Sequence, residues 1–98
     1  DNNKEDHVSM GVAAAHKARE AVALLETVIA LELLTAAQAL EFLKPLRPGR
    51  GVERAYREVR ERVEPLVTDR VLAPDIAALE ALVRSGALAA IWQDLPAA

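Results

Sequence analysis

The stretch AVALLETVIALELLTAAQALEFL, residues 21–43, decides the fold of this chain. Its apolar side chains recur at the three- and four-residue spacing of an α-helix and fall into two rows. One row holds Val22, Leu25, Ile29, Leu33, Ala36 and Leu40, and the other holds Leu24, Val28, Leu31 and Leu34. A helix that is apolar on several faces is normally surrounded by other helices. We therefore predict the central helix of a large helical bundle, or of an oligomer whose other helices lie outside this chain.

The composition favours an all-α fold. The chain has 98 residues, which allows at most one small domain. Hydrophobic residues make up 52% of the chain and aromatic residues only 3%. The helix formers Ala, Leu, Glu and Arg dominate, whereas Thr, Ile and the aromatic residues, which favour strands, are scarce. A sheet is therefore not expected.

The helical pattern begins before the quoted stretch. Residues 1–6 are polar and show no periodicity, whereas residues 8–43 follow a nearly unbroken helical pattern. Asp6 is the expected N-cap, because its carboxylate can accept hydrogen bonds from free backbone amides and complements the helix dipole. The predicted helix would be about 50 Å long, which is too long for a domain of this size.

Residues 44–98 are expected to form a C-terminal region of two or three shorter helices. Breaking residues end the long helix and form a tight connection: Pro45, Pro48, Gly49 and Gly51. The second helix has an apolar face made of Val52, Ala55, Tyr56, Val59 and Val63. Its other face carries oppositely charged pairs at four-residue spacing: Glu53 with Arg57, Arg54 with Glu58, Arg57 with Glu61, and Glu58 with Arg62. Mixed signs favour a solvated face over a surface that docks a partner.

The remaining helices are marked by proline, aspartate and glycine. Pro65 ends the second helix, and residues 67–73 are predicted to be irregular. Asp75 is the expected N-cap of a third helix. The apolar face of that helix consists of Ile76, Leu79, Leu82 and Val83. Gly86 is predicted to end it in the left-handed conformation, and residues 87–92 to form a last short helix.

The charge pattern excludes several classes of partner. The net charge is −3, and the 12 basic and 15 acidic residues are interspersed, so neither a nucleic-acid-binding patch nor an acidic tail is present. A membrane span is not expected, because polar residues interrupt the long apolar stretch: Glu26, Glu32, Gln38 and Glu41. The chain has no cysteine, which excludes thiol chemistry and is compatible with the reducing cytoplasm that we predict as its location.

Few features outside the first residues suggest chemistry. Residues 49–51, Gly-Arg-Gly, are too short for a phosphate-binding loop and follow a helix rather than a strand. Tyr56 and Trp92 stand at apolar positions of their helices, which predicts that both belong to the core.

The motif that carries functional information is NKEDHVSMG, residues 3–11. It resembles the signature that opens the last long helix of histidine ammonia-lyases, which usually reads Asn-Gln-Glu-Asp-His-Val-Ser-Met-Gly. Eight of its nine positions match, and Lys4 is the one departure. The stretches at residues 31–34, 36–39, 74–76 and 82–88 are similar to the central helix and the end of the same family. The resemblance therefore spans nearly the whole chain and identifies it as a C-terminal segment, residues 1–98, with residues 1–7 as an active-site loop.

The resemblance implies a parent enzyme that deaminates L-histidine to urocanate and ammonia. Members of the family form their electrophile, methylidene-imidazolone, from an internal Ala-Ser-Gly tripeptide. This chain contains no such tripeptide, and the nearest sequence, Ser85-Gly86-Ala87, has the wrong order. The 98 residues alone are therefore expected to be inactive and to hold no cofactor. Family members are tetramers built around a shared helical bundle, which implies a homo-oligomer here.

Glu5 is the one predicted catalytic and substrate-binding residue. In the family, the glutamate at this position lies beside the substrate and is thought to interact with the imidazole or to assist proton transfer. Phenylalanine and tyrosine lyases of the same superfamily commonly have glutamine there, and an amide is no useful base. The other interpretation is that an acidic residue ahead of a helix only complements the dipole. Asp6 is assigned to capping.

Several alternatives remain open. Lys4 would favour the charged form of Glu5 if its ammonium points toward that carboxylate, which leaves a phenylalanine or tyrosine ammonia-lyase or an aminomutase as a possible parent. The chain could also be a non-catalytic helical association module. A metal site built from Glu5, Asp6, His7 and His16 is not expected, because His7 and His16 are nine residues apart, about 2.5 helical turns, and point in different directions.

Overall fold

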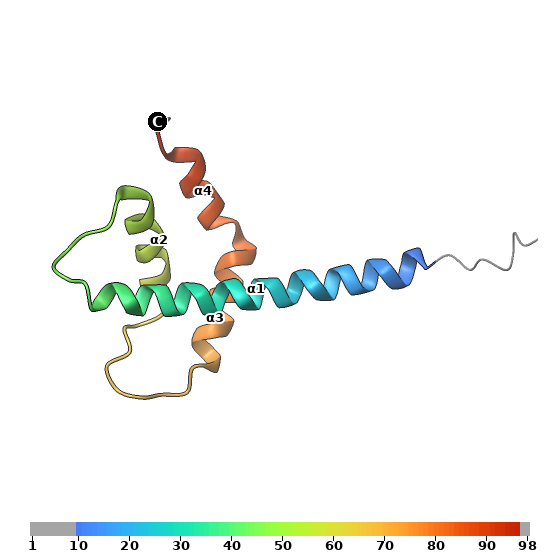
Figure 1. Ribbon diagram of the computed structural model, residues 1–98, viewed down its shortest axis with the longest axis horizontal. Helices are drawn as coiled ribbons and strands as arrows, with labels where there is room; N and C mark the ends of the chain where they lie inside the picture. The colour runs from blue at the N-terminus through green and yellow to red at the C-terminus, as the bar shows by residue number, and fades with distance from the viewer. Residues whose placement is uncertain (1–9, 97–98) are drawn as a thin grey trace, which may run out of the picture.

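The fold is a long helix with three short helices gathered around its C-terminal half (Figure 1). The computed structural model describes residues 10–96, and in that part of the chain every regular element is a helix. The elements are α1 (Gly11–Glu41), α2 (Arg50–Arg60), α3 (Ala73–Ser85) and α4 (Ala87–Asp94). The predictions of an all-α fold and of one long helix followed by two or three shorter ones are confirmed.

The long helix is shorter at its C-terminal end than predicted. α1 contains 31 residues, which corresponds to about 46 Å. Residues 42 and 43 leave the α-helix because their amides donate to carbonyls three residues back, Phe42 to Ala39 and Leu43 to Leu40, both at 3.1 Å. Bonds of this kind tighten the last turn of a helix. Met10 precedes the helix without a side-chain cap, whereas the predicted cap, Asp6, lies outside the described residues.

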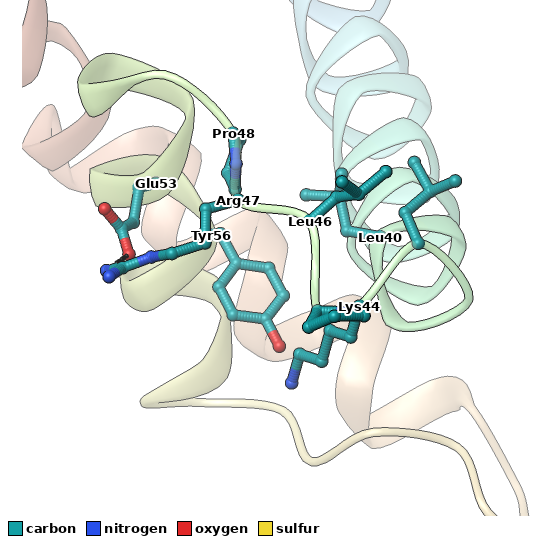
Figure 2. Close-up of a pocket in the computed structure, with 9 residues that line it drawn as sticks. Leu40, Lys44, Leu46, Arg47, Pro48, Glu53 and Tyr56 are labelled. Atoms are coloured by element: carbon teal, nitrogen blue, oxygen red, sulfur yellow. Dashed lines mark hydrogen bonds and ion pairs between the residues drawn. The ribbon is translucent and has the colours of Figure 1, made fainter.

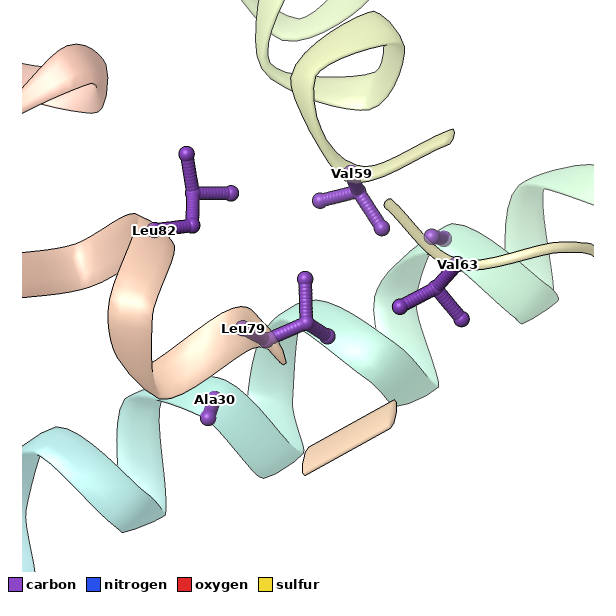
Figure 3. Packing of buried hydrophobic residues seen from close by; sticks show 6 residues of the cluster. Ala30, Val59, Val63, Leu79 and Leu82 are labelled. Atoms are coloured by element: carbon purple, nitrogen blue, oxygen red, sulfur yellow. The ribbon is translucent and has the colours of Figure 1, made fainter. Parts of the chain in front are cut away.

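The core forms where α3 crosses α1. Two small residues of α1, Ala30 and Ala37, are 0% and 3% exposed and allow the helices to approach closely. Leu79 of α3 lies in the middle of this cluster (Figure 3). The other buried members are Val59, Val63 and Leu82. This packing fixes α2 and α3 on one part of α1 and leaves the N-terminal half of α1 projecting beyond the other helices (Figure 1).

The second helix begins earlier than predicted and includes Gly51. A Cβ atom at that position would lie 2.9 Å from Cδ1 of Leu95, so glycine gives the C-terminal segment room to pack on α2. The helix also ends well before Pro65, although Val63 still donates its amide to the carbonyl of Val59 at 2.8 Å. Gly51 is thus a packing residue and not part of the connection.

Two of the four charged pairs predicted on α2 are ion pairs in the structure. Glu53 and Arg57 are 3.5 Å apart, and Glu58 and Arg62 are 2.9 Å apart. The pairs Arg54 with Glu58 and Arg57 with Glu61 are not among the ion pairs of residues 10–96. Arg54 instead reaches Asp94 of α4 at 3.2 Å, which links two helices that the sequence pattern did not connect.

Asp75 is not the N-cap of the third helix, because α3 already begins at Ala73. Its carboxylate accepts a hydrogen bond from Nε of Arg70 at 3.0 Å. The same guanidinium donates to the carbonyls of Pro65 and Glu64 at 3.2 Å and 2.6 Å. Asp75 therefore holds the arginine that orders the preceding connection. Gly86, in contrast, has the predicted left-handed conformation, with φ of 81°.

Many large apolar side chains of the described chain are exposed. Trp92 is 80% exposed, so its assignment to the core is wrong: α4 buries the neighbouring Ile91 instead. Tyr56 is half-buried, in line with its predicted position. Along α1, Val22, Leu24 and Leu25 are each more than half exposed, because α3 covers only the region around Ala30. Within residues 10–96 no helix combines the length and the apolarity that crossing a membrane requires.

The close approach at Ala30 predicts a specific effect of side-chain size. Ala30→Leu should lower the free energy of unfolding by about 1–3 kcal/mol, because added methyl groups would force α1 and α3 apart. Ala23→Leu, at an exposed position of the same helix, should change it by less than about 0.5 kcal/mol. Urea unfolding followed by circular dichroism measures both. Equal effects of the two substitutions would contradict the proposed role of Ala30.

Candidate functional site

The site predicted from the sequence precedes α1 in the chain. Glu5, together with Lys4, Asp6 and His7, is outside the described residues. The first described turns of α1 form a shallow hollow lined by Gly11, Val12, Ala15, His16 and Arg19. His16 is exposed, and residues 10–96 contain no group of three or more His, Cys, Asp or Glu side chains that could hold a metal ion. The role of Glu5 therefore stays a prediction.

A second candidate site lies at the opposite end of α1. It is a cavity of about 460 Å³ between the last turn of α1, the connection to α2 and α2 itself (Figure 2). Its lining residues are Leu40, Leu43, Lys44, Pro45, Leu46, Arg47, Pro48, Glu53 and Tyr56. A volume of this size lies within the range of ordinary ligand pockets. Gly11 and Glu41 are separated by about 45 Å of helix, so the two candidate sites are distinct.

Glu41 does not line this cavity, but it holds two residues that do, Lys44 and Tyr56. Its carboxylate accepts a hydrogen bond from the Tyr56 hydroxyl and forms ion pairs with Lys44 Nζ at 3.0 Å and Arg60 Nε at 3.3 Å. The hydrogen bond from Tyr56 is the main reason that the pKa of Glu41 lies below its usual value, with Lys44 and Arg60 adding to the effect. The Glu41 carboxylate in turn raises the pKa of Lys44. These four residues are called the Glu41 cluster below.

Tyr56 is held by cations as well as by its hydroxyl group. Lys44 Nζ lies 5.5 Å and Arg60 Cζ 5.3 Å from the centre of its ring, which are cation–π distances. Arg60 also donates from Nη1 to the carbonyl of Val63 at 3.2 Å, so the cluster reaches the end of α2. Its Nη2 is buried and has no hydrogen-bond acceptor among the described residues.

A second ion pair borders the cavity. Arg47, in the connection, binds the Glu53 carboxylate of α2 (Figure 2). Glu53 also pairs with Arg57 at 3.5 Å. The hydrogen bond from Arg47 is the main cause of the lowered pKa of Glu53, and the same contact raises the pKa of Arg47. The connection is thus tied to α2 through Arg47 and to α1 through Lys44.

The comparisons with known proteins concern the same residues. A family model described as aromatic amino acid lyase matches residues 1–61. The chain belongs to this family. It is 58% identical to a histidine ammonia-lyase of Symbiobacterium thermophilum over 88 residues, and these residues make up 90% of the chain. It is 53% identical over 92 residues to a histidine ammonia-lyase of Caldanaerobacter subterraneus, which covers 94% of the chain.

A third relative extends the comparison to another lineage. A histidine ammonia-lyase of Deinococcus radiodurans is 48% identical over 91 residues, or 93% of the chain. The aromatic amino acid lyase segment seen here spans only about 17% of the length of such relatives. No solved structure matches the chain.

The family model covers the Asn3–Gly11 motif, α1 and α2, so both candidate sites of this aromatic amino acid lyase lie inside the matched region. The Glu41 cluster is not suited to acid–base chemistry. A carboxylate that accepts from three donors is stabilised in its charged form and is therefore a weak base. The cluster instead fixes α2 against the end of α1. Sequence analysis missed it, because Glu41 was considered only as an interruption of an apolar stretch and Tyr56 only as core.

The geometry predicts a pH-dependent contribution of Tyr56 to stability. Tyr56→Phe should lower the free energy of unfolding by about 1.5–3 kcal/mol near neutral pH, because it removes a hydrogen bond to a charged acceptor. The folded-state pKa of Glu41 lies below 4.5. Its stabilising contribution is therefore complete above about pH 4.5 and is lost as the pH falls through the lower folded-state value.

Urea unfolding at a series of pH values measures this effect. The matched control is Tyr56→Phe in a Glu41→Gln background, where the substitution should cost clearly less because the charged acceptor is gone. An equal cost in both backgrounds would show that the hydroxyl group of Tyr56 does not act through Glu41.

Proposed function

We propose that this chain is part of a histidine ammonia-lyase whose complete polypeptide eliminates ammonia from L-histidine to give urocanate. The observation that carries the proposal is the identity of 58% and 53%, over nine-tenths of the chain, to two proteins named histidine ammonia-lyase. The Asn3–Gly11 motif and the family match over residues 1–61 support it.

Glu5 is the residue of this chain that we assign to the chemistry. It stands six residues before the first residue of α1, Gly11. A carboxylate can hold an imidazole N–H or accept a proton, whereas the amide of glutamine is no useful base.

The electrophile of the reaction would come from outside these 98 residues. Methylidene-imidazolone forms from Ala-Ser-Gly, and the chain contains no such tripeptide. When bound, this group activates the substrate for loss of ammonia. The residues present here would contribute one wall of the active site, with Glu5 oriented toward the substrate side chain. We therefore propose that the isolated chain has no lyase activity, and that the whole enzyme acts in the cytoplasm.

The rival function is a helical association module without catalysis. The exposed apolar side chains of α1 favour association in either case, because large apolar surfaces in water mark interaction sites. We propose that α1 packs with copies of itself in a homo-oligomer, a tetramer in the complete enzyme. A phenylalanine or tyrosine lyase, or an aminomutase, remains the alternative within the enzyme class, because Lys4 departs from the usual motif.

The association proposal predicts that the chain is not a monomer. Sedimentation equilibrium at micromolar concentration should show at least a dimer. The double substitution Leu24→Gln and Leu31→Gln should weaken association, because both side chains lie in the second apolar row of α1 and are 68% and 43% exposed. The control Val67→Gln and Val71→Gln alters two exposed residues outside the helices and should have no effect. A clean monomer of the unaltered chain would rule out the proposal.

The lyase proposal predicts that Glu5→Gln impairs urocanate formation. In the protein expressed from the complete reading frame, the substitution should lower turnover about 100-fold or more, because a general acid–base group typically contributes that much. Urocanate absorbance measures the turnover. Glu20→Gln, an exposed glutamate of α1, is the matched control and should leave turnover unchanged.

Circular dichroism must show that the Glu5→Gln protein keeps its fold. Unchanged turnover would reduce Glu5 to a residue that complements the helix dipole. Absence of urocanate formation by the unaltered complete protein, together with normal association, would favour the association module.

A further inference from the structure

The cavity at the C-terminal end of α1 combines an apolar wall with cationic side chains. Its apolar lining comes from three leucines and two prolines: Leu40, Leu43, Leu46, Pro45 and Pro48. Figure 2 shows Leu40 and Leu46 on one side of the space, and Tyr56 with the pair of Arg47 and Glu53 on the other. The two prolines restrict the connection that forms one edge, so the wall is largely preformed.

The hydrogen-bonding capacity of the lining is unbalanced. Lys44 has three N–H donors and Arg47 five, and each is matched with one carboxylate in the structure. The carboxylate that lines the cavity is shared between two cations, since Glu53 pairs with both Arg47 and Arg57. Both cations are also accessible, with side chains 58% and 73% exposed. Among the charged lining residues and their ion-pair partners, the cations Lys44, Arg47, Arg57 and Arg60 outnumber the carboxylates Glu41 and Glu53.

We propose that this cavity binds a small amphipathic anion, of the chemical class of medium-chain aliphatic carboxylates. The hydrocarbon part would lie against the leucine and proline wall, and the carboxylate would meet Lys44 and Arg47 at the rim. The excess of positive charge and the exposed N–H donors of Lys44 and Arg47 select an anion over a neutral or cationic molecule of equal size. The leucine and proline wall favours a hydrocarbon chain. An aromatic ligand is not favoured, because Lys44 and Arg60 already lie over the ring of Tyr56, on which it would stack. The proposal does not depend on lyase activity.

Three ligands of equal length test the proposal: octanoate, octanamide and octylammonium. The chain, labelled for NMR, is titrated with each at concentrations below micelle formation. Octanoate should shift the amide resonances of residues 40–48 and bind about three-fold more tightly than octanamide, the gain typical of an exposed ion pair. Octylammonium should bind most weakly. Equal affinity for all three ligands, or shifts confined to other residues, would overturn the proposal, as would the absence of binding.

Two pairs of variants locate the charge and the apolar contact. Lys44→Gln with Arg47→Gln should remove the preference for octanoate over octanamide. The control, Lys17→Gln with Arg50→Gln, makes the same change in net charge at two exposed cations outside the cavity and should keep the preference. Leu46→Ala should weaken all three ligands, whereas Leu24→Ala, at a similarly exposed leucine on α1, should not.

Loss of the preference in both charge variants would show that net charge alone attracts the anion, and would overturn the assignment. Equal weakening by Leu46→Ala and Leu24→Ala would likewise overturn it, because binding would then reflect exposed apolar surface in general. Circular dichroism of each variant excludes loss of the fold as the cause.

Discussion

The close contact of α1 and α3 around Ala30 is the constraint on which the other helices depend. Ala30 and Leu79 are both 0% exposed, and an interior packed at this density leaves little room for added atoms. Val59 and Val63 complete the same cluster, so α2 is positioned by the contact that positions α3. α4 follows from Gly86, whose left-handed backbone turns the chain back toward α2, where Asp94 meets Arg54 and Leu95 packs at Gly51. One small cluster thus sets the relative places of all four helices.

Ion pairs add to the apolar core in holding the helices together. Ion pairs at both ends of the helical region link elements far apart in sequence: Glu41 with Arg60, and Glu26 with Arg84, which also pairs with Glu80 at 3.2 Å. Exposed pairs of this kind contribute little each. The Glu41 cluster differs because Glu41 and Arg60 are largely buried, with side chains 16% and 13% exposed. It replaces apolar packing in a region where the core has few side chains.

The sequence was sufficient for the order of the helices and insufficient for their contacts. Proline, glycine and apolar spacing predicted one long helix, two or three shorter ones and the left-handed Gly86, because these signals act within a few residues. The buried residues of α1 were not predicted: the apolar rows contain neither Ala30 nor Ala37, because the crossing point depends on α3. Asp75 was misassigned because α3 begins two residues earlier, which leaves its carboxylate to accept from Arg70. Trp92 was misassigned because burial on α4 depends on the helices packed against it. The Glu41 cluster joins residues 19 apart through a connection whose path no local pattern fixes.

The projection of α1 beyond its contact with α3 has a mechanical consequence. From Glu26, which pairs with Arg84 of α3, the helix extends about 22 Å to Gly11 and projects beyond α2, α3 and α4 (Figure 1). A rotation of only one degree about the contact would move the Gly11 end by about 0.4 Å, which is close to the tolerance of about 0.5 Å for a catalytic group. Gly11, the last residue of the Asn3–Gly11 motif, therefore lies at the tip of a long projecting helix, where precise placement requires stiffness. Packing of the exposed apolar side chains between Val12 and Leu31 against neighbouring helices would supply that stiffness, so that association and alignment of the active-site wall would be two effects of one surface.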